Sequence, residues 1–321
     1  MDVKFFIGPM SKNVVDTIID FQKETKEKVG FIPSRRQVEY NGGYSNNWTT
    51  AEFCKYATNH LLVRDHAGPG QGNVNDDGYE SLSQDSNYFD IIHVDPWKQY
   101  PKYKDGLKWS INMINFCFSK NKDIIYEVGT EEAIRKFEVN ELDNFILDLK
   151  KNLNTNVFKK IRYLVIQSGT SLSIDKNTGV YDKKRLKRMI ELSKKHNLIS
   201  KEHNGDYISE NIILEKMNEG LDSINIAPEF GLIETQTYLD NIQDKKTFDL
   251  FWKICFESNK WIKWVPKNFN PLKEKETLIK ISAHYIFSNS FFIKEIKNKL
   301  PEIDIEIRKN IYRKLNKLYG Y

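Results

Sequence analysis

Residues 61–70 read Leu-Leu-Val-Arg-Asp-His-Ala-Gly-Pro-Gly, and this stretch carries the strongest indication of the fold. An apolar run that is followed at once by Gly and Pro predicts a buried strand ending in a loop. Asp65 and His66 then stand at the carboxyl end of that strand, where parallel α/β proteins place their functional groups. A carboxylate beside an imidazole offers a proton acceptor next to a metal ligand or second base. The alternative is that Asp65 caps the next segment and His66 is an ordinary rim residue.

Short apolar runs like this one recur eight times before residue 243 and alternate with amphipathic segments. The runs predicted as strands are Lys4–Ile7, Gly30–Pro33, Leu61–Val63, Asp90–Val94, Ile124–Val128, Arg162–Gln167, Leu198–Lys201 and Ser223–Ile226. Eight strand–helix units predict a parallel (β/α)8 barrel, that is, a TIM barrel. A doubly wound sheet is the alternative fold. It is disfavoured because Gly8-Pro9-Met10-Ser11, and no G-x-G-x-x-G turn, follows the first predicted strand.

The segments between these runs show the helical period. They are Val14–Lys26, Phe53–Asn59, Gly106–Phe118, Val139–Leu153, Asp182–Asn197, Glu210–Gly220 and Glu234–Ile242. Thr49-Thr50-Ala51-Glu52 has the pattern of a capping box at the start of the second of them. Gln71–Asn87 is polar and rich in Gly, Asn and Asp, which predicts a long loop with about one turn of helix.

The alternation stops after Ile242, and the rest of the chain has only helical patterns. These are Phe248–Phe256, Glu274–Phe287, Phe291–Leu300 and Ile303–Leu318. We therefore predict two parts: residues 1–245 as the barrel, with its active site at the carboxyl ends of the strands, and residues 246–321 as a helical extension. The extension is expected to pack on the barrel or to mediate self-association.

Composition limits the class of protein. The chain has 321 residues, of which 40% are hydrophobic and 13% aromatic, so a large core is available. Its formal net charge is only +5 and no nucleic-acid-binding motif is present, so no nucleic-acid partner is expected. No apolar run approaches the roughly 20 residues of a spanning helix, and no signal peptide is visible, so no membrane association is expected. Cys54, Cys117 and Cys255 are far apart, which fits a reducing, cytoplasmic location.

The predicted strands end in metal-ligand and acid–base residue types. Three of the six histidines, His66, His93 and His203, stand at such ends. His93 and Asp95 are two residues apart and share one face of a strand, and placing that face inward avoids burying a charge under a helix. Imidazoles and carboxylates on one rim suit a divalent ion of the zinc or manganese type with one coordination position left open. His60 and His196 are expected at the surface, and His284 is expected to be packed within a helix.

Several ordered motifs at these strand ends resemble those of one known family. They are Gln37-Val38 with Gly42-Gly43-Tyr44, Asp65-His66-Ala67-Gly68-Pro69, His93-Val94-Asp95, Val128-Gly129-Thr130-Glu131, Gln167-Ser168-Gly169 and Glu202-His203-Asn204-Gly205-Asp206-Tyr207. With these motifs the chain resembles the class II tagatose-bisphosphate aldolase family, specifically its non-catalytic subunit, and the related ketose 4-epimerases. The resemblance runs from about Phe31 to Leu239, with a weaker match around Ala283–Phe287.

The resemblance implies a (β/α)8 barrel, a divalent metal and a set of site residues. The metal is expected to be zinc, with manganese or nickel as alternatives. By the resemblance, Asp65 moves a proton on the C4 hydroxyl, His66 and His203 bind the metal, and Glu131 is the third ligand, with His93 as its substitute. Asp95 and Glu229 are the further candidate catalytic carboxylates. The candidate substrate-binding residues are Arg35, Arg36, Gln37, Gln167, Ser168, Asp206 and Asn225.

The expected activity is that of a metal-dependent enzyme acting on a ketose or ketose phosphate. Class II aldolases have a Gly-rich phosphate loop after strand seven, whereas this chain has His203-Asn204-Gly205-Asp206 there. This departure favours C4 epimerisation by retro-aldol and aldol steps over cleavage of a ketose (bis)phosphate. A non-catalytic subunit that stabilises a class II aldolase, and a barrel that binds a sugar without reacting it, are the alternatives. The expected partners are a sugar or sugar phosphate and either a second copy of the chain or an aldolase subunit.

Overall fold

The computed structural model describes residues 3–173 and 176–320, so the outermost residues of both predicted parts lie outside it. Eight parallel strands form the sheet, in the spatial order β2-β1-β10-β9-β6-β5-β4-β3. These strands are β1 (Phe5–Ile7), β2 (Val29–Phe31), β3 (Val63–Ala67), β4 (Ile91–Val94), β5 (Ile125–Val128), β6 (Ile161–Ile166), β9 (Ile199–Glu202) and β10 (Ser223–Ile226).

The two ends of this sheet meet and close the barrel. The Phe31 N–H donates to the Leu61 carbonyl and the Asp65 N–H to the Pro33 carbonyl, both at 3.0 Å. Parallel bridges accompany these bonds, from Phe31 to Leu62 and from Ser34 to Asp65. The predicted (β/α)8 fold is confirmed. The barrel closes at Leu61, Leu62 and Asp65, which belong to the stretch from which the fold was predicted.

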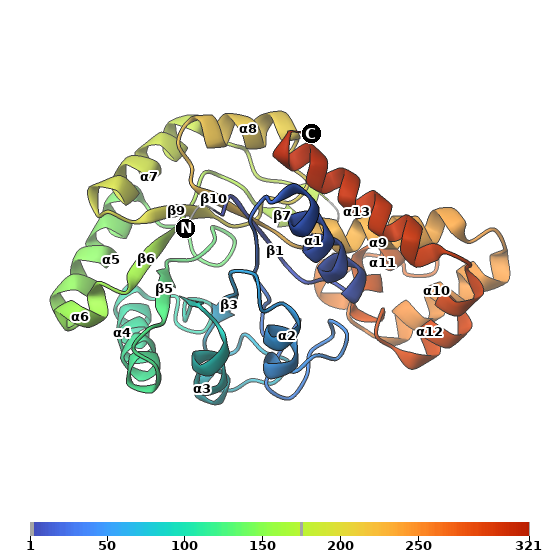
Figure 1. Cartoon of the computed structure of the whole chain (residues 1–321), viewed down its shortest axis with the longest axis horizontal. Coiled ribbons are helices and arrows are strands. Elements are labelled where there is room, and N and C mark those ends of the chain that lie inside the picture. The colour runs from blue at the N-terminus through green and yellow to red at the C-terminus, as the bar shows by residue number, and fades with distance from the viewer. Residues whose placement is uncertain (1–2, 174–175, 321) are drawn as a thin grey trace.

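Helices surround the barrel as an outer ring (Figure 1). They are α1 (Lys12–Thr25), α2 (Thr50–Tyr56), α3 (Tyr79–Tyr88), α4 (Tyr103–Lys120), α5 (Val139–Asn152), α6 (Thr155–Phe158), α7 (Lys183–Lys195), α8 (Glu210–Asn218) and α9 (Pro228–Asn241). Two short antiparallel strands, β7 (Leu172–Ser173) and β8 (Lys176–Asn177), follow β6. The expected capping box is present, since Thr49 and Glu52 exchange side-chain and backbone hydrogen bonds at the start of α2.

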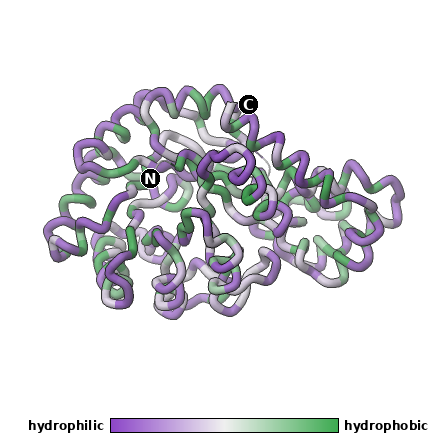
Figure 2. The backbone as a smooth tube through the Cα atoms, in the orientation of Figure 1, coloured by the Kyte–Doolittle hydropathy of each residue, from purple (hydrophilic) through white to green (hydrophobic). Residues whose placement is uncertain are grey.

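The outer helices are held by one apolar face each. On α5, Leu142, Phe145, Ile146 and Leu149 recur at helical spacing and are at most 1% exposed. Figure 2 shows the same alternation of hydrophobic and hydrophilic residues along the other helices. Burying such faces against the sheet provides most of the stabilisation of a fold of this kind.

The prediction of a long loop over Gln71–Asn87 is wrong, because the ten-residue helix α3 occupies its second half. The buried face of α3 consists of Ser81, Leu82, Asp85 and Ser86, so only one of its four core-facing residues is apolar. Asp85 forms an ion pair at 2.8 Å with Arg64, and both side chains are fully buried. Because the core-facing side of α3 is mostly polar, the sequence lacks the helical spacing of apolar residues on which the prediction relied.

Helices of the extension gather at one side of the barrel (Figure 1). They are α10 (Lys245–Glu257), α11 (Lys275–Ser282), α12 (Ser290–Glu295) and α13 (Ile303–Tyr319), with 3-10 turns η1 (Ile262–Trp264), η2 (Ala283–Tyr285) and η3 (Lys297–Lys299). The single helix expected over Glu274–Phe287 ends at Ser282 and tightens into η2.

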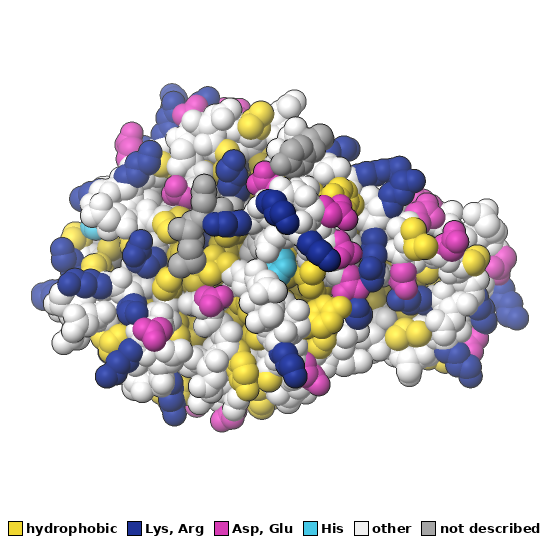
Figure 3. Space-filling view, viewed as in Figure 1, with side chains coloured by type: hydrophobic (Ala, Val, Ile, Leu, Met, Phe, Trp, Pro, Cys, Tyr) yellow, Lys and Arg dark blue, Asp and Glu magenta, His cyan; other side chains and the backbone are white. Residues whose placement is uncertain are grey.

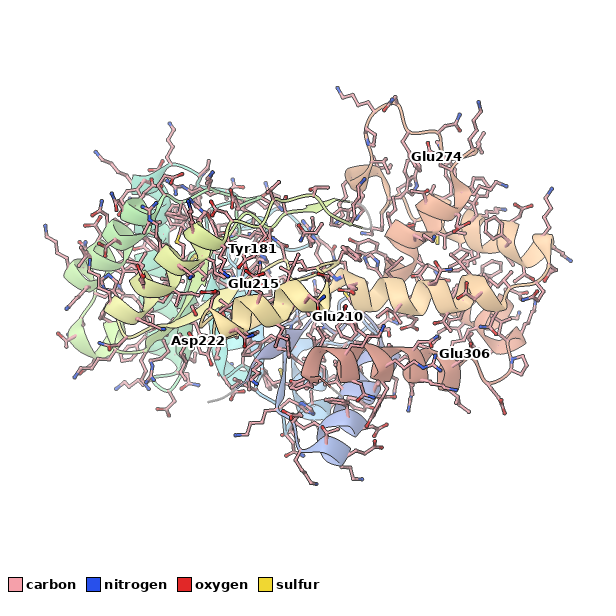
Figure 4. All side chains as sticks on the ribbon, turned by 90° about the horizontal axis from the view of Figure 1, so that it is seen from above. Tyr181, Glu210, Glu215, Asp222, Glu274 and Glu306 are labelled. Atoms are coloured by element: carbon pink, nitrogen blue, oxygen red, sulfur yellow. The ribbon has the colours of Figure 1, made fainter. Side chains whose placement is uncertain are left out.

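The last helix, α13, connects the extension to the barrel. The ring of Tyr319 packs at 5.1 Å from that of Phe5 and at 5.4 Å from that of Phe21. Figure 4 shows Glu306 on α13 and Glu210 at the start of α8, and Lys314 of α13 pairs with Glu210 at 3.2 Å. The end of the chain is therefore anchored on barrel elements formed from the start of the chain and from the region around residue 210.

Charges of both signs are mixed on the face drawn in Figure 3, and the described helices include no candidate membrane span. None of the helices that the structure describes is long and apolar enough to cross a bilayer. On the face drawn in Figure 3, Lys and Arg side chains are interspersed with Asp and Glu. This mixed charge agrees with the modest net charge of +5.

The packing of α13 predicts unequal effects for two isoleucines on that helix. Ile311 is fully buried, whereas Ile305 is 65% exposed. Ile311→Ala should lower the free energy of unfolding by about 2–4 kcal/mol, because it leaves a cavity, while Ile305→Ala should change it by less than about 0.5 kcal/mol. Denaturant unfolding of both variants measures this difference, and equal effects would contradict the described docking of α13.

Candidate metal centre

Three imidazoles meet around one carboxylate at the carboxyl ends of β3, β4 and β9. The Oδ1 atom of Asp65 lies 3.6 Å from His66 Nε2, 3.5 Å from His93 Nδ1 and 3.6 Å from His203 Nδ1. The three rings lie with their centroids 4.8–5.4 Å apart. The His93 and His203 side chains are at most 3% exposed, while Asp65 and His66 are 18% and 16% exposed. We call these four residues the imidazole cluster.

The outer nitrogen of each imidazole faces a hydrogen-bond acceptor. Asp95 Oδ2 lies 2.6 Å from His66 Nδ1, and the carbonyl of Gly129 lies 3.1 Å from His93 Nε2. Glu127 Oε1 lies 2.7 Å from His203 Nε2. Acceptors at these positions keep the proton on the outer nitrogen, so the inner nitrogen of each ring can present its lone pair to the cluster.

The backbone at the end of β3 adopts a conformation that is uncommon for residues other than Gly. His66 has φ 44°, and the pairing of β3 with β4 shifts register between Arg64 and Ala67. In this conformation the His66 N–H donates to His93 Nδ1 at 3.2 Å, so the single lone pair of this nitrogen faces the backbone N–H and would bind an ion only in place of that hydrogen bond. Local strain of this kind collects at functional sites, where the surrounding structure enforces it.

A buried ion pair supports the cluster from within the barrel. Lys201 Nζ lies 2.8 Å from Glu127 Oε2, and neither side chain is exposed. Burial raises the pKa of Glu127, but the charge of Lys201 and the bond to His203 outweigh it and hold that pKa well below its usual range. Burial lowers the pKa of His203. Glu127 therefore stays ionised and orients a neutral His203, which is the form that binds a metal.

The charges around Asp65 favour an ionised Asp65 carboxylate next to a protonated His66. Burial raises the pKa of Asp65, but the charge of His66 and the nearby His93 and His203 lower it overall. Burial lowers the pKa of His66, yet the carboxylates of Asp65 and Asp95 raise it to about 10. A proton on His66 thus balances the Asp65 carboxylate, and a bound cation would take over this role.

The donor set of the cluster fits a divalent cation. One ligand atom from each of the four residues lies within 4.8 Å of the other three. Four donors placed about 2.0–2.1 Å from a zinc ion would be roughly 3.3–3.4 Å apart, which is close to the spacing around Asp65 Oδ1. This oxygen is buried and has no hydrogen-bond partner among the described residues. Buried polar atoms without partners are uncommon and indicate a missing ligand or ion.

A cavity of about 230 Å³ opens directly onto the cluster. Asp65, His66 and His203 form part of its wall, together with Asn225 of β10, whose amide atoms are buried and without a hydrogen bond among the described residues. Residues of the extension complete the wall, namely Lys263, Trp264, His284 and Tyr285. The extension is therefore part of the cavity, which the barrel alone does not enclose.

The structure brings some of the sequence-predicted residues to this cavity. Glu131 lines the cavity but is not among the four clustered ligands, whereas its proposed substitute His93 is. Asp95 lies behind His66 and also accepts from Thr130 Oγ1 at 3.1 Å, which makes it a positioning group. Other predicted residues on the cavity wall are Arg36, Gln37, Asp206 and Asn225.

Four predicted site residues have structural partners and do not line the cavity. Arg35 is 2% exposed and is paired with Glu39 and Asp76, both at 2.6 Å. Glu229 turns to Lys314 at 2.6 Å and accepts from the Tyr207 N–H. Gln167 bonds to loop backbone at Thr130, Arg135 and Phe137, and Ser168 bonds to Glu202 and Lys216.

Sequence reasoning assigned no role to several residues that shape this site. Glu127 and Lys201 stand in predicted strands that become β5 and β9, with β6 between them, and an inward-facing acid and base on these strands is the signal that could have paired them. His284 was expected to be packed, and it is 6% exposed, but it also lines the cavity. His60 was expected at the surface, yet it is 9% exposed and bonds to the Val29 carbonyl through Nδ1.

The sequence matches no family model and no curated protein. Solved structures share the fold at low identity. A probable tagatose 6 phosphate kinase from Sinorhizobium meliloti 1021 is 12% identical, with a TM-score of 0.75 and 99% of both chains covered. The fructuronate-tagaturonate epimerase UxaE from Cohnella laeviribosi is 10% identical, with a TM-score of 0.65, and 99% of this chain and 81% of that chain are covered.

The fructose-bisphosphate aldolase from Campylobacter jejuni is 11% identical, with a TM-score of 0.58, and 99% of this chain and 90% of that chain are covered. At these identities the comparisons establish a shared fold that includes the helical extension.

The cluster predicts a selective loss of metal binding. His203→Ala should weaken binding of Zn²⁺ by roughly 100-fold or more, because it removes a donor from the cluster. His196→Ala is the matched control, since His196 pairs with Asp143 at 2.6 Å away from the cluster and should leave the affinity unchanged. Calorimetric titration of metal-stripped protein measures both. Equal Zn²⁺ affinity for wild type and His203→Ala would contradict the assignment.

Proposed function

We propose that this chain is a metal-dependent enzyme of the aldolase type that acts on a ketose or ketose phosphate and catalyses C4 epimerisation. The observation that carries the proposal is the imidazole cluster at the wall of a cavity, where three imidazoles surround a carboxylate oxygen that has no hydrogen-bond partner in the described part of the chain. The fold is shared with proteins described as an aldolase and as an epimerase, which supports this reaction class.

In this proposal His66, His93 and His203 hold the ion through their inner nitrogens. Catalytic metal sites commonly use three protein ligands and keep one position for substrate or water. A divalent ion bound there supplies a Lewis acid for the substrate oxygens at C2 and C3. Asp95, the Gly129 carbonyl and Glu127 keep the three rings oriented.

Asp65 is the proposed proton-transfer residue. Its side chain is partly exposed, lines the cavity and belongs to the cluster, so a substrate held at the cluster places a hydroxyl beside it. The carboxylate takes the proton of the C4 hydroxyl as the C3–C4 bond opens, and the aldehyde stays in the cavity. After the aldehyde turns and the bond forms again on its other face, Asp65 returns the proton, which inverts C4.

The start of α9 favours epimerisation over cleavage of a bisphosphate. In parallel barrels a helix N-terminus at this level is a natural phosphate site. Here Asp206 Oδ1 already accepts from the N–H groups of Ala227 and Glu229 at 2.9 and 2.8 Å. Burial, together with the nearby Glu229, raises the pKa of Asp206 to about 8. A carboxyl group thus occupies the position that a phosphate would need.

The enclosure of the cavity supports retention of the aldehyde. Tyr44 from the barrel and Trp264 and Tyr285 from the extension contribute to its wall. The buried amide of Asn225 makes no hydrogen bond to the residues that the structure describes and can bind a substrate hydroxyl. A retained aldehyde that can turn is what separates epimerisation from release of a cleavage product.

Asp65→Asn should lower the turnover of the best ketose substrate roughly 100- to 10,000-fold, because the amide cannot accept the hydroxyl proton. Metal content should be kept, since the three imidazoles remain. Asp123→Asn is the control, as this side chain is 99% exposed. NMR of a panel of ketoses and ketose phosphates incubated with the Zn²⁺, Mn²⁺ or Ni²⁺ forms identifies the product.

Detection of the C4 epimer by NMR supports the proposal. Detection of a released aldehyde would show that the enzyme cleaves the sugar and does not epimerise it. No turnover of any sugar by the metal-loaded protein would contradict an enzyme and favour the non-catalytic subunit. In that case Asp65→Asn should still support an aldolase partner.

A further inference from the structure

Four basic side chains lie near one another at the outer end of the cavity, and two of them, Arg36 and Lys263, line it. They are Arg36 after β2, Lys98 after β4, and Lys260 and Lys263 in the segment that follows α10. Within residues 3–173 and 176–320 none of the four has a carboxylate oxygen within 4.0 Å. We call these residues the cation group.

The contacts of the cation group leave its charge unbalanced. Arg36 Nε donates to the Gly72 carbonyl at 3.3 Å, and Lys98 Nζ donates to the Gly70 carbonyl at 3.2 Å. Lys263 Nζ lies 4.6 Å from the Trp264 ring centroid and 5.0 Å from that of Tyr285. The adjacent Arg35 is different, since two carboxylates neutralise it. Arg35 is thus paired with carboxylates, whereas Arg36 can bind an anionic ligand.

The charges of the cation group act on one another. Burial lowers the pKa of Lys263, and the charges of Arg36, Lys260 and Lys98 lower it further. Burial and the charge of Arg36 likewise lower the pKa of Lys98, and they outweigh the opposite effect of Asp95. Holding like charges together is unfavourable, and a bound anion removes the repulsion.

The cation group and the imidazole cluster share one cavity. Arg36 and Lys263 line the cavity that contains Asp65 and His203. Arg36, Lys263 and Tyr285 also line an adjoining surface hollow, together with Gly72, Asn73 and Lys260. The cavity therefore has an inner end suited to hydroxyl and carbonyl oxygens and an outer end suited to a negative charge.

We propose that Arg36 and Lys263, supported by Lys98 and Lys260, bind the anionic group of the substrate, either a phosphate ester or a carboxylate. This rests on the proposed function, because it takes the imidazole cluster as the place where the sugar reacts. Arg36 can bind two oxygens of such a group through its planar guanidinium, and Lys263 adds a point charge from the extension. The substrate is thus an anionic sugar that spans the cavity from the cluster to the extension.

Calorimetry on the Zn²⁺-loaded protein tests this with four probes: inorganic phosphate, a neutral ketohexose, its 6-phosphate and the corresponding hexuronate. At least one of the two charged sugars should bind about tenfold tighter than the neutral ketohexose. Arg36→Gln and Lys263→Gln should each weaken binding of that charged sugar about tenfold and leave the neutral sugar unchanged. Lys267→Gln is the matched control, because Lys267 is a lysine of the same segment that does not line the cavity.

Tighter binding of the 6-phosphate assigns a phosphate ester, and tighter binding of the hexuronate assigns a carboxylate. Equal affinity for charged and neutral sugars, or unchanged affinity of the charged sugar in both variants, would overturn the inference. A separate Zn²⁺ titration distinguishes failure of this inference from failure of the proposed function. If the protein binds Zn²⁺ but has equal affinity for charged and neutral sugars, only this inference is contradicted. If it binds the charged sugar but takes up no metal, the proposed function is contradicted.

Discussion

The hydrogen bond from the Asp65 N–H to the Pro33 carbonyl closes the barrel, and the side chain of the same residue lies at the centre of the imidazole cluster. The fold and the site therefore depend on one strand end. Closure fixes where β3 stops, and the positive φ of His66 sets the direction of its ring. The adjacent β4 supplies His93, and His203 follows β9, which does not neighbour β3. A cluster assembled in this way needs the complete sheet, because its members come from strands 3, 4 and 7 of the barrel.

The fold was predictable because buried parallel strands give short apolar runs that the helices separate. The prediction was wrong over Gln71–Asn87, where Asp85 pairs with Arg64 and a helix packs through a mostly polar face. The candidate site was predictable in part for the same reason. Strand ends converge, so histidines at three of them were expected to meet, and they do.

Sequence could not tell which polar residues face the cavity and which neutralise one another. Arg35 and Arg36 are neighbours in sequence, yet Arg35 is buried between Glu39 and Asp76 while Arg36 lines the cavity. Glu229 stands where a catalytic carboxylate was expected, but Lys314, far away in sequence, pairs with it. Such long-range pairs have no local pattern. The contribution of the extension to the cavity was hidden in the same way, because it depends on how α11, η2 and α13 pack against α9 and how α10 packs against α11.

The account depends on the three inner nitrogens sharing one cation. Anomalous diffraction from crystals soaked in Zn²⁺ measures this most directly. We expect one strong peak in the cavity, within about 2.0–2.1 Å of His66 Nε2, His93 Nδ1 and His203 Nδ1. A peak bound only elsewhere, or no peak at these nitrogens in fully soaked crystals, would contradict the central claim.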